Sequence, residues 1–350
     1  MNEILFLSSF LLLIAFFLTL DLGVFNKNSH EISLKESLIF TLFWIILAVG
    51  FFFFLRYFGD LLHNITCIER LEEINQLHKH GLTFNPLADF DANLQLYRNQ
   101  LSLEFITGYI IEKALSVDNI FVILMLFISF GTDKKYYHRV LFWGIIGAVV
   151  MRFIFIFSLS ALIHQFEWVL AIFGGILIYS AIKLFFNRNE DEKIDVKNHK
   201  LVKFLSKRFP ITPDYVGEKF VTKINGKRFL TPLLLLLIVI EFSDVLFAVD
   251  SVPAIFSITQ DSYIVFFSNI FAIIGLRSLF FLLSSIVSMF RFLKPGLSVL
   301  LVFIGVKMLL EVLFHISIST QLSLLIILSI LIICILLSVA IPKKVKNEKK

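Results

Sequence analysis

The chain is poor in cysteine, with only Cys67 and Cys334 in 350 residues. Two thiols cannot build a disulfide framework, and they are too few for a thiolate metal site within one chain. The sequence also lacks a glycine-rich nucleotide-binding loop, which argues against ATP hydrolysis. It has neither the basic first segment nor the small-residue cleavage site of a secretory signal, so the first apolar run is expected to remain as a helix.

Long apolar runs dominate what is present. Hydrophobic side chains make up 58% of the chain, phenylalanine occurs 42 times, and the mean hydropathy is +0.87. A water-soluble core cannot bury so much apolar surface, so the sequence predicts an all-α, polytopic membrane protein. Runs long enough to span a bilayer predict about nine transmembrane helices. They cover approximately residues 4–20, 37–55, 102–130, 139–160, 167–186, 231–256, 262–287, 297–314 and 321–341.

The basic residues are distributed unevenly over the predicted loops. The net charge of +5 would allow a nucleic-acid partner, but about 23 Lys and Arg fall on one side of the predicted membrane and about four on the other. Cytoplasmic loops are enriched in Lys and Arg, so this asymmetry is an orientation signal. We therefore expect an inner (plasma) membrane protein with its N-terminus outside and its C-terminus in the cytoplasm. Its surroundings are the lipid bilayer, and no nucleic-acid partner is expected.

Two segments place acidic residues inside apolar runs. They read Glu112-Lys-Ala-Leu-Ser-Val-Asp118-Asn and Asp244-Val-Leu-Phe-Ala-Val-Asp250-Ser. Charges at this depth cost about 3 kcal/mol each on insertion scales and mark ion, proton or substrate pathways. Each segment is followed by a motif with an arginine and then by one with a lysine. These later motifs are residues 149–152 and 274–277, and residues 177–184 and 301–308.

The repeated motifs predict two repeats of three helices each. An odd number of helices inverts the second repeat in the membrane, which is typical of transporters with a site at the repeat interface near the midplane. The expected organisation is two scaffold helices (1–56), an extracytoplasmic amphipathic segment (57–100), repeat 1 (101–186), a basic cytoplasmic loop (187–230), inverted repeat 2 (231–314), and a final helix with a basic tail (315–350).

The acids and nearby oxygen atoms predict a hard-oxygen metal site. The expected ligands are Glu112, Asp118, Glu241, Asp244, Asp250, Asn119, Ser251 and the backbone carbonyl of Val249, with Ser116 and Asn269 close by. Pro253 is expected to break its helix and free the carbonyl of Val249, because proline has no N–H to donate. Such oxygen ligands without thiolate suit Mn²⁺, Mg²⁺ or Ca²⁺. The cations expected to balance the acids are Lys113, Arg152, Arg277 and Lys307.

The two acid-bearing helices are expected to face each other. Since they run in opposite directions, Glu112 would lie level with Asp250, and Asp118 level with Asp244. Two carboxylates brought close together can exchange protons for a cation, because the repulsion between like charges favours protonation of one of them.

The outer segment carries His63, His78 and His80 among acidic residues. The spacing of Leu71, Ile74 and Leu77 favours a short amphipathic helix resting on the membrane surface. A metal-collecting role for the histidines is the alternative. Against it, residues two apart on a helix point in different directions.

Four motifs resemble one family of membrane proteins. They are residues 104–122, residues 241–254, Gly275-Leu-Arg277-Ser and Gly305-Val-Lys307-Met. From about residue 40 onward the chain resembles the TerC family of integral membrane proteins, closest to its Alx-type branch. The resemblance implies manganese export, protection from manganese excess, supply of metal to extracytoplasmic enzymes and a historical link to tellurium resistance. It also implies that the acids at positions 112, 118, 241, 244 and 250 carry the function.

Together these features predict a secondary transporter, not an enzyme. We expect it to export a divalent cation, most favourably Mn²⁺, in exchange for protons and without a permanently bound cofactor. The alternative is a non-transporting membrane factor that assists metal loading or insertion of exported proteins. An intramembrane aspartyl protease also needs two aspartates on two spans, but its usual Gly-Asp context is missing, since Asp118 and Asp250 both follow valine.

Overall fold

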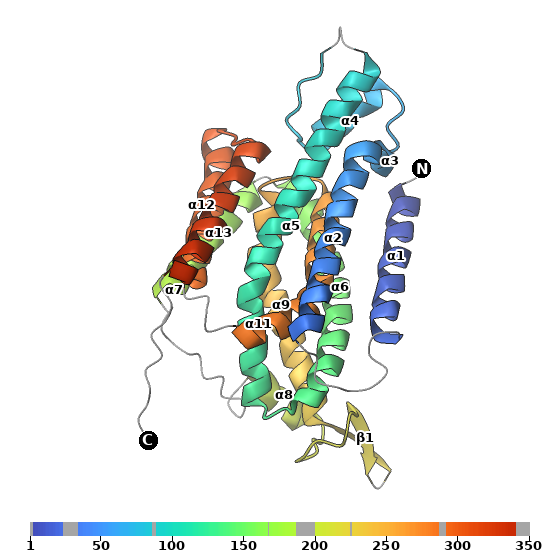
Figure 1. The fold of residues 1–350 in the computed structure, drawn as a ribbon, viewed down its shortest axis with the longest axis vertical. Helices are drawn as coiled ribbons and strands as arrows, with labels where there is room; N and C mark the ends of the chain where they lie inside the picture. The colour runs from blue at the N-terminus through green and yellow to red at the C-terminus, as the bar shows by residue number, and fades with distance from the viewer. Residues whose placement is uncertain are drawn as a thin grey trace.

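The computed structural model describes residues 3–23, 34–85, 89–166, 168–186, 200–224, 226–286 and 292–340. Within these ranges the chain forms a bundle of long helices and one short β-hairpin (Figure 1). The helices are α1 (Glu3–Gly23), α2 (Leu34–Phe58), α3 (Asp60–His63), α4 (Ile68–Leu77), α5 (Phe90–Ser129), α6 (Lys134–Gln165), α7 (Trp168–Phe186), α8 (Lys200–Arg208), α9 (Pro232–Phe256), α10 (Ser262–Ile274), α11 (Leu276–Ile286), α12 (Leu293–Phe314) and α13 (Thr320–Ala340). The strands are β1 (Val221–Ile224) and β2 (Lys227–Leu230).

Apolar helices of membrane-spanning length confirm the polytopic α-helical fold. Among the described residues, six helices are long and apolar enough to cross a membrane, or seven if α10 and α11 form one bent span. The expected number of nine stays a prediction. The two other expected spans correspond to α1, whose apolar part is short, and to α5, whose sequence carries six charged residues.

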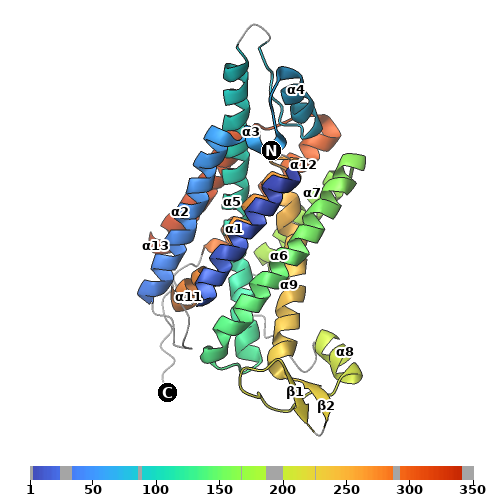
Figure 2. The ribbon, with the colours of Figure 1, turned by 90° about the vertical axis from the view of Figure 1, so that its right-hand side faces the viewer.

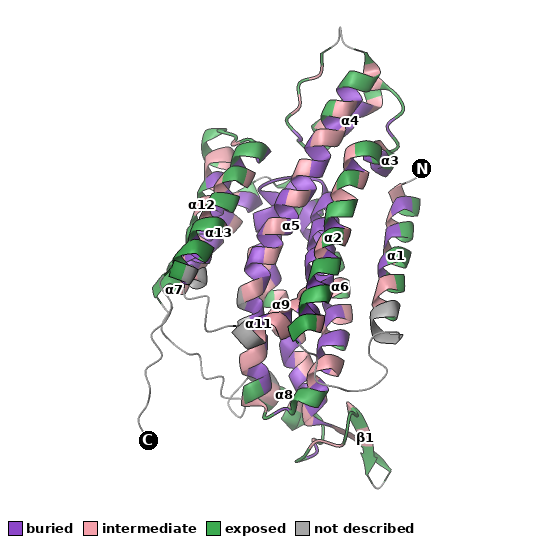
Figure 3. Cartoon of the chain, viewed as in Figure 1, coloured by how far each residue is buried: buried purple, intermediate pink, exposed green. Residues whose placement is uncertain are grey.

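The outer helices present apolar side chains outward, whereas the centre of the bundle is buried. Leu325 and Leu336 of α13 are both 62% exposed, and α2 and α12 carry similar outward-facing residues. In α10, every residue except Tyr263 is buried. Figure 3 shows this contrast between the mostly buried α5 and the exposed outer faces of α12 and α13. An apolar exterior around a buried centre is what a lipid environment requires.

The helices of the two predicted repeats pack in a reciprocal pattern. α5 packs against α10, α6 packs against α9, and α7 lies along α12. An exchange of the two repeats would leave this set of contacts unchanged. The inverted repeat stays a prediction with which this packing agrees.

The expected break at Pro253 is wrong. α9 continues through Pro253 and ends at Phe256. The fixed φ of proline is compatible with a helix, and burial of all residues from Ser251 to Phe256 holds the last turn in place. The bend lies instead at Gly275, where α10 and α11 meet at 42°.

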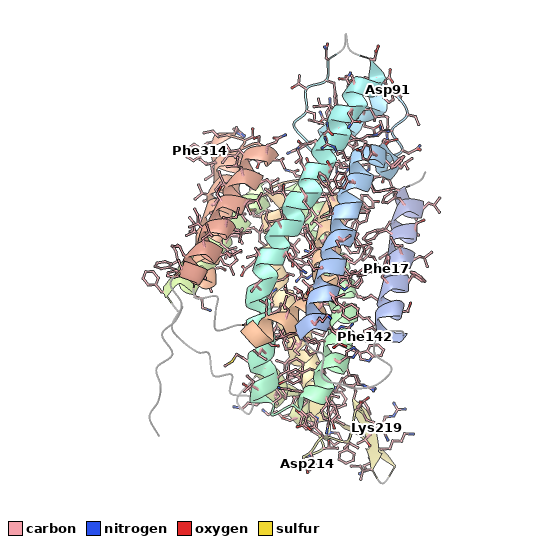
Figure 4. All side chains as sticks on the ribbon, in the orientation of Figure 1. Phe17, Asp91, Phe142, Asp214, Lys219 and Phe314 are labelled. Carbon is pink, nitrogen blue, oxygen red and sulfur yellow. The ribbon has the colours of Figure 1, made fainter. Side chains whose placement is uncertain are left out.

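The two ends of the bundle differ in structure. Figure 2 shows α3 and α4 at one end and α8 with the β-hairpin at the other. Figure 4 places Asp91 at the α4 end, and Asp214 and Lys219 at the hairpin end. The antiparallel hairpin, in which Val221 pairs with Leu230, lies in the predicted loop 187–230, where no strand was expected.

The outer segment does not simply rest on a membrane. Leu71 and Ile74, on the apolar face of α4, are fully buried in the protein core. The amphipathic pattern thus correctly predicts a helix, but Leu71 and Ile74 of its apolar face pack against protein, whereas Leu77 is exposed.

Candidate functional site

Arg152 lies at the centre of the polar site. It stands midway along α6 and is 1% exposed. Its guanidinium binds Asp244 of α9 with two hydrogen bonds, from Nη2 to Oδ1 at 2.9 Å and from Nε to Oδ2 at 3.1 Å. Nη1 also donates to Glu112 of α5. One cation thus holds carboxylates from two other helices, and a bidentate bond of this kind fixes both distance and orientation.

Asn269 of α10 completes the link to a fourth helix. Its Oδ1 accepts a hydrogen bond from Arg152 Nη1 at 2.8 Å, and its Nδ2 donates to Glu112 Oε2 at 3.2 Å. Ser251 Oγ lies 3.5 Å from the same Nη1. Two of the neutral side chains expected near the acids, Asn269 and Ser251, therefore lie beside Arg152.

The cluster joins two acidic side chains to one arginine. Lys113 is a second basic residue that acts electrostatically on Glu112. A buried charge without a partner is costly, so such a cluster is held together by direct ion pairs. Each of the two acids therefore has a cationic partner within the protein.

Glu241 lies one turn before Asp244 on α9, and its carboxylate packs against Gly147 of α6. A Cβ at position 147 would stand 2.1 Å from Glu241 Oε1, so any larger residue there would displace the end of the Glu241 side chain. Glu241 Oε2 is buried and has no hydrogen-bond partner among the described residues. This oxygen is free to accept a proton or a cation.

Asp250 lies apart from the Arg152 cluster. Its Oδ1 accepts a hydrogen bond from Ser180 of α7 at 3.1 Å, and Lys183 of the same helix acts on it electrostatically. The expected pairing of Glu112 with Asp250 is therefore not what the structure shows, because Glu112 shares Arg152 with Asp244. The helices are rotated so that the acid nearer the start of each motif faces the arginine.

The structure also positions other residues expected at the site. Asn119 and Ser116 are buried in α5, and Ser116 Oγ has no partner in the described part of the chain. The side chain of Asp118 lies outside the described residues. Val249 precedes Pro253 by four residues in an unbroken helix, so its carbonyl lacks the usual helical donor.

The three other expected cations have separate surroundings. Lys113 donates to the carbonyl of Ala272 at 3.2 Å. Arg277 Nη1 donates to His138 Nε2 at 2.7 Å. Lys307 is buried, and the acids that act on it are Glu311 and Glu104. Of the four expected cations, Arg152 is the one that forms ion pairs with predicted site acids, Glu112 and Asp244, within the described residues.

Sequence reasoning missed two partners of the acids. Gly147 gives no chemical signal, because its role is the absence of a side chain beside Glu241. Ser180 is one polar residue within an apolar span, and it lies in the predicted lysine motif 177–184. Its position in that motif was the only available signal.

Known proteins similar to this chain are membrane proteins. Residues 97–346 match the family described as "Integral membrane protein TerC family". An "Uncharacterized membrane protein STKORF319" of Myxococcus xanthus is 38% identical over 320 residues, which cover 91% of this chain and 87% of the relative. A "Putative membrane-bound redox modulator Alx" of Photorhabdus laumondii is 38% identical over 315 residues, which cover 90% and 88%. The protein of the same name in Salmonella typhi is 48% identical over 221 residues, which cover 63% and 68%. No solved structure matches the chain.

Proposed function

Because the chain belongs to the TerC family of integral membrane proteins, we propose that it is a secondary transporter that exports a divalent cation, most favourably Mn²⁺. The observation that carries this proposal is the buried cluster in which Arg152 joins Glu112 and Asp244. Ionisable groups within membrane-spanning helices are expensive, and they mark transport pathways.

The donor set suits a hard or borderline divalent cation. Glu112, Asp244 and Glu241 offer carboxylate oxygens, and Asn269 offers an amide oxygen. Mn²⁺, Mg²⁺ and Ca²⁺ all prefer such ligands. A divalent cation would compete with the Arg152 guanidinium for the same carboxylate oxygens, so the arginine acts as a tethered counter-ion when no metal is bound.

Proton exchange is the coupling that these residues can support. Glu241 packs against Gly147 and keeps one carboxylate oxygen unpaired. A neutral carboxylic acid needs no counter-ion, whereas the ionised group does. We therefore assign proton uptake and release to Glu241, next to the metal-binding acid Asp244. In the membrane, the hairpin end would face the cytoplasm and the α4 end the outside, as the positive loops indicate.

The direct test is Mn²⁺ flux into proteoliposomes that contain only this protein, with and without a pH gradient. At subsaturating Mn²⁺, the Asp244→Asn variant should lower the initial rate at least about tenfold, because it removes a charged ligand; a tenfold loss of affinity corresponds to about 1.4 kcal/mol. Glu218→Gln is the matched control, because Glu218 is an exposed carboxylate whose partner is Arg139 at the hairpin end. Equal rates in the two variants, or no flux in folded wild-type protein, would contradict the proposal.

A second arm of the same experiment moves Glu241 without changing any charge. Gly147→Ala places a methyl group where the Glu241 carboxylate lies, and the flexible end of that side chain must move. Gly144→Ala is the control one turn away, where a Cβ meets Ile240 and Leu237 only at 3.8 and 3.9 Å. We expect Gly147→Ala to reduce proton-driven flux while Gly144→Ala leaves it unchanged.

The same measurement addresses the second class of function, a non-transporting factor that assists metal loading or protein insertion. Folded protein that binds Mn²⁺ but moves none under either gradient would favour that class. The names of some relatives suggest a redox function, for which cysteines would be the natural candidates. The two free cysteines are Cys67, which is exposed, and Cys334, which is buried in α13.

A further inference from the structure

A second polar cluster is buried at the α4 end of the bundle, away from Arg152. One potential ligand atom from each of His63, His78 and Asp261 lies within 4.8 Å of the others. All three side chains are buried, with exposed fractions of 0%, 7% and 0%. Buried groups of this polarity need partners, so the cluster requires an explanation.

His63 and Asp261 bind each other directly. His63 Nε2 lies 2.9 Å from Asp261 Oδ2, and its Nδ1 lies 3.1 Å from Glu3 Oε1. Asp261 is also the N-cap of α10, where its Oδ1 accepts hydrogen bonds from the backbone N–H groups of Tyr263 and Ile264. The carboxylate is thereby held rigidly, with Oδ2 directed toward the imidazole.

An ion pair explains these two residues but not the third. Burial by itself would lower the pKa of His63, but the Asp261 and Glu3 carboxylates together outweigh burial and raise the pKa to about 9. His63 and Asp261 are thus satisfied as an ion pair. His78 is not, since its Nδ1 is buried without a hydrogen-bond partner. Its ring centroid lies 4.8 Å from that of His63.

The backbone around His78 is also unusual. Lys79 has a φ of +51°, which is in the left-handed region that residues with a Cβ rarely adopt. This turn separates His78 from His80, so the two histidines do not lie on one helix. Both side chains are buried. His80 Nδ1 bonds Glu104 at 2.9 Å, and its Nε2 is a second buried nitrogen without a partner.

We propose that His63, His78 and Asp261 form a binding site for a first-row transition-metal ion of the Zn²⁺ class, which on binding releases the proton between His63 Nε2 and Asp261 to solvent. Two imidazoles and a carboxylate are a known set of protein ligands for such ions, and they leave one coordination position open. Ligand atoms around one Zn²⁺ stand roughly 3.3 Å apart, so the observed group needs a small closure around the metal. His78 places one ring nitrogen within this group, and its Nδ1 has no hydrogen-bond partner among the described residues.

This site differs from the Arg152 cluster in position and in chemistry. Glu104, which binds His80, precedes Glu112 by eight residues on α5, or about 12 Å at the rise of a helix. The Arg152 cluster offers oxygen donors, whereas the outer site offers imidazole nitrogens, which suit softer ions. Metal binding by His63, His78 and Asp261 does not depend on the proposed transport, because these residues lie at the α4 end of the bundle.

The test is Co²⁺ and Zn²⁺ binding to the purified full chain in detergent. Co²⁺ reports nitrogen ligands through its visible absorption bands, and Zn²⁺ should displace it and abolish those bands. We expect one bound Co²⁺ with these bands, and His78→Gln should weaken its binding by at least about tenfold, since even loss of an outer-shell partner costs 10–100-fold. His78→Gln breaks no described hydrogen bond of Nδ1, so the variant is expected to fold.

Two controls make the result specific. His164→Gln removes an exposed imidazole whose ring lies 6.2 Å from that of His78, and it should leave the Co²⁺ spectrum unchanged. Asp244→Asn alters the Arg152 cluster and should also leave the spectrum unchanged. Co²⁺ binding that is insensitive to His78→Gln would contradict the proposed site of His63, His78 and Asp261. The absence of Co²⁺ bands in folded wild-type protein would contradict it as well. Loss of Mn²⁺ flux with an intact Co²⁺ spectrum would count only against the proposed transport.

Discussion

Individual residues show how the chain places charges in an apolar interior. Arg152 is almost completely buried, and it donates four hydrogen bonds to Asp244, Glu112 and Asn269. A lysine could supply the charge but not the planar two-pronged contact with Asp244. The arginine therefore both neutralises the acids and sets the relative positions of the helices that carry them.

Removing Arg152 should destabilise the protein strongly. Arg152→Gln leaves the buried Glu112 and the half-buried Asp244 without the arginine's counter-charge. Removing one partner of a buried ion pair typically costs about 3–5 kcal/mol. Arg139→Gln is the matched control on the same helix, because Arg139 pairs with the exposed Glu218 and such pairs contribute about 0–1 kcal/mol. Thermal unfolding in detergent measures both variants.

A double variant tests whether charge is the cause. Arg152→Gln combined with Asp244→Asn removes one charge of each sign, so it should unfold at a higher temperature than Arg152→Gln alone. If Arg152→Gln and Arg139→Gln were equally mild, the ion pairs of Arg152 would not be important for stability.

At the scale of elements, close approach of two helices depends on glycine. α7 and α12 cross where Gly174 and Gly305 face each other. A Cβ on Gly305 would lie 2.7 Å from the backbone carbonyl oxygen of Gly174 and 2.8 Å from Ile178 Cγ1. Small residues at such crossings allow membrane helices to pack closely without polar contacts.

A methyl group at this crossing should separate α7 from α12. Gly305→Ala meets backbone, which cannot rotate away, and overpacking of this kind costs about 1–3 kcal/mol. Gly175→Ala, beside the crossing, is the control, because a Cβ there meets nothing within 4 Å. Gly305→Ala should therefore lower the unfolding temperature, whereas Gly175→Ala should change it little. Equal temperatures would show that the crossing tolerates a wider separation.

At the scale of the whole molecule, the two ends of the bundle are built differently. The α4 end is closed by polar contacts, including the half-buried bond from Arg98 Nε to Asp60 at 2.7 Å. The hairpin end is joined to the α5–α6 turn through Tyr215, whose hydroxyl donates to the carbonyl of Phe130 at 2.9 Å. Each end therefore has a distinct surface on its side of the membrane.

The orientation can be tested with the exposed Cys67 at the α4 end. A membrane-impermeant thiol reagent should label Cys67 from outside intact cells, because the positive loops predict that this end is extracytoplasmic. Lys223→Cys in a Cys67→Ser background introduces a thiol at an exposed position of β1. This variant should be labelled only after the cells are opened, and the reverse pattern would show the opposite orientation.

Several properties of this protein followed from the sequence alone. The apolar composition predicted a helical membrane protein, and the acids within apolar runs predicted a buried polar site that includes Arg152, Glu112 and Asp244. Both follow from local chemistry, because the cost of an apolar surface in water or of a charge in lipid does not depend on the details of packing.

The tertiary structure decided which of these groups meet. Helix rotation brought Glu112 and Asp244 to one arginine and placed Asp250 beside Ser180, which the spacing of the acids along each helix could not reveal. His63 and Asp261 are 198 positions apart, and they form a cluster only because α3 packs beside the start of α10. The sequence specifies which chemical groups are available, but the distances between groups on different helices depend on side-chain packing across the whole bundle.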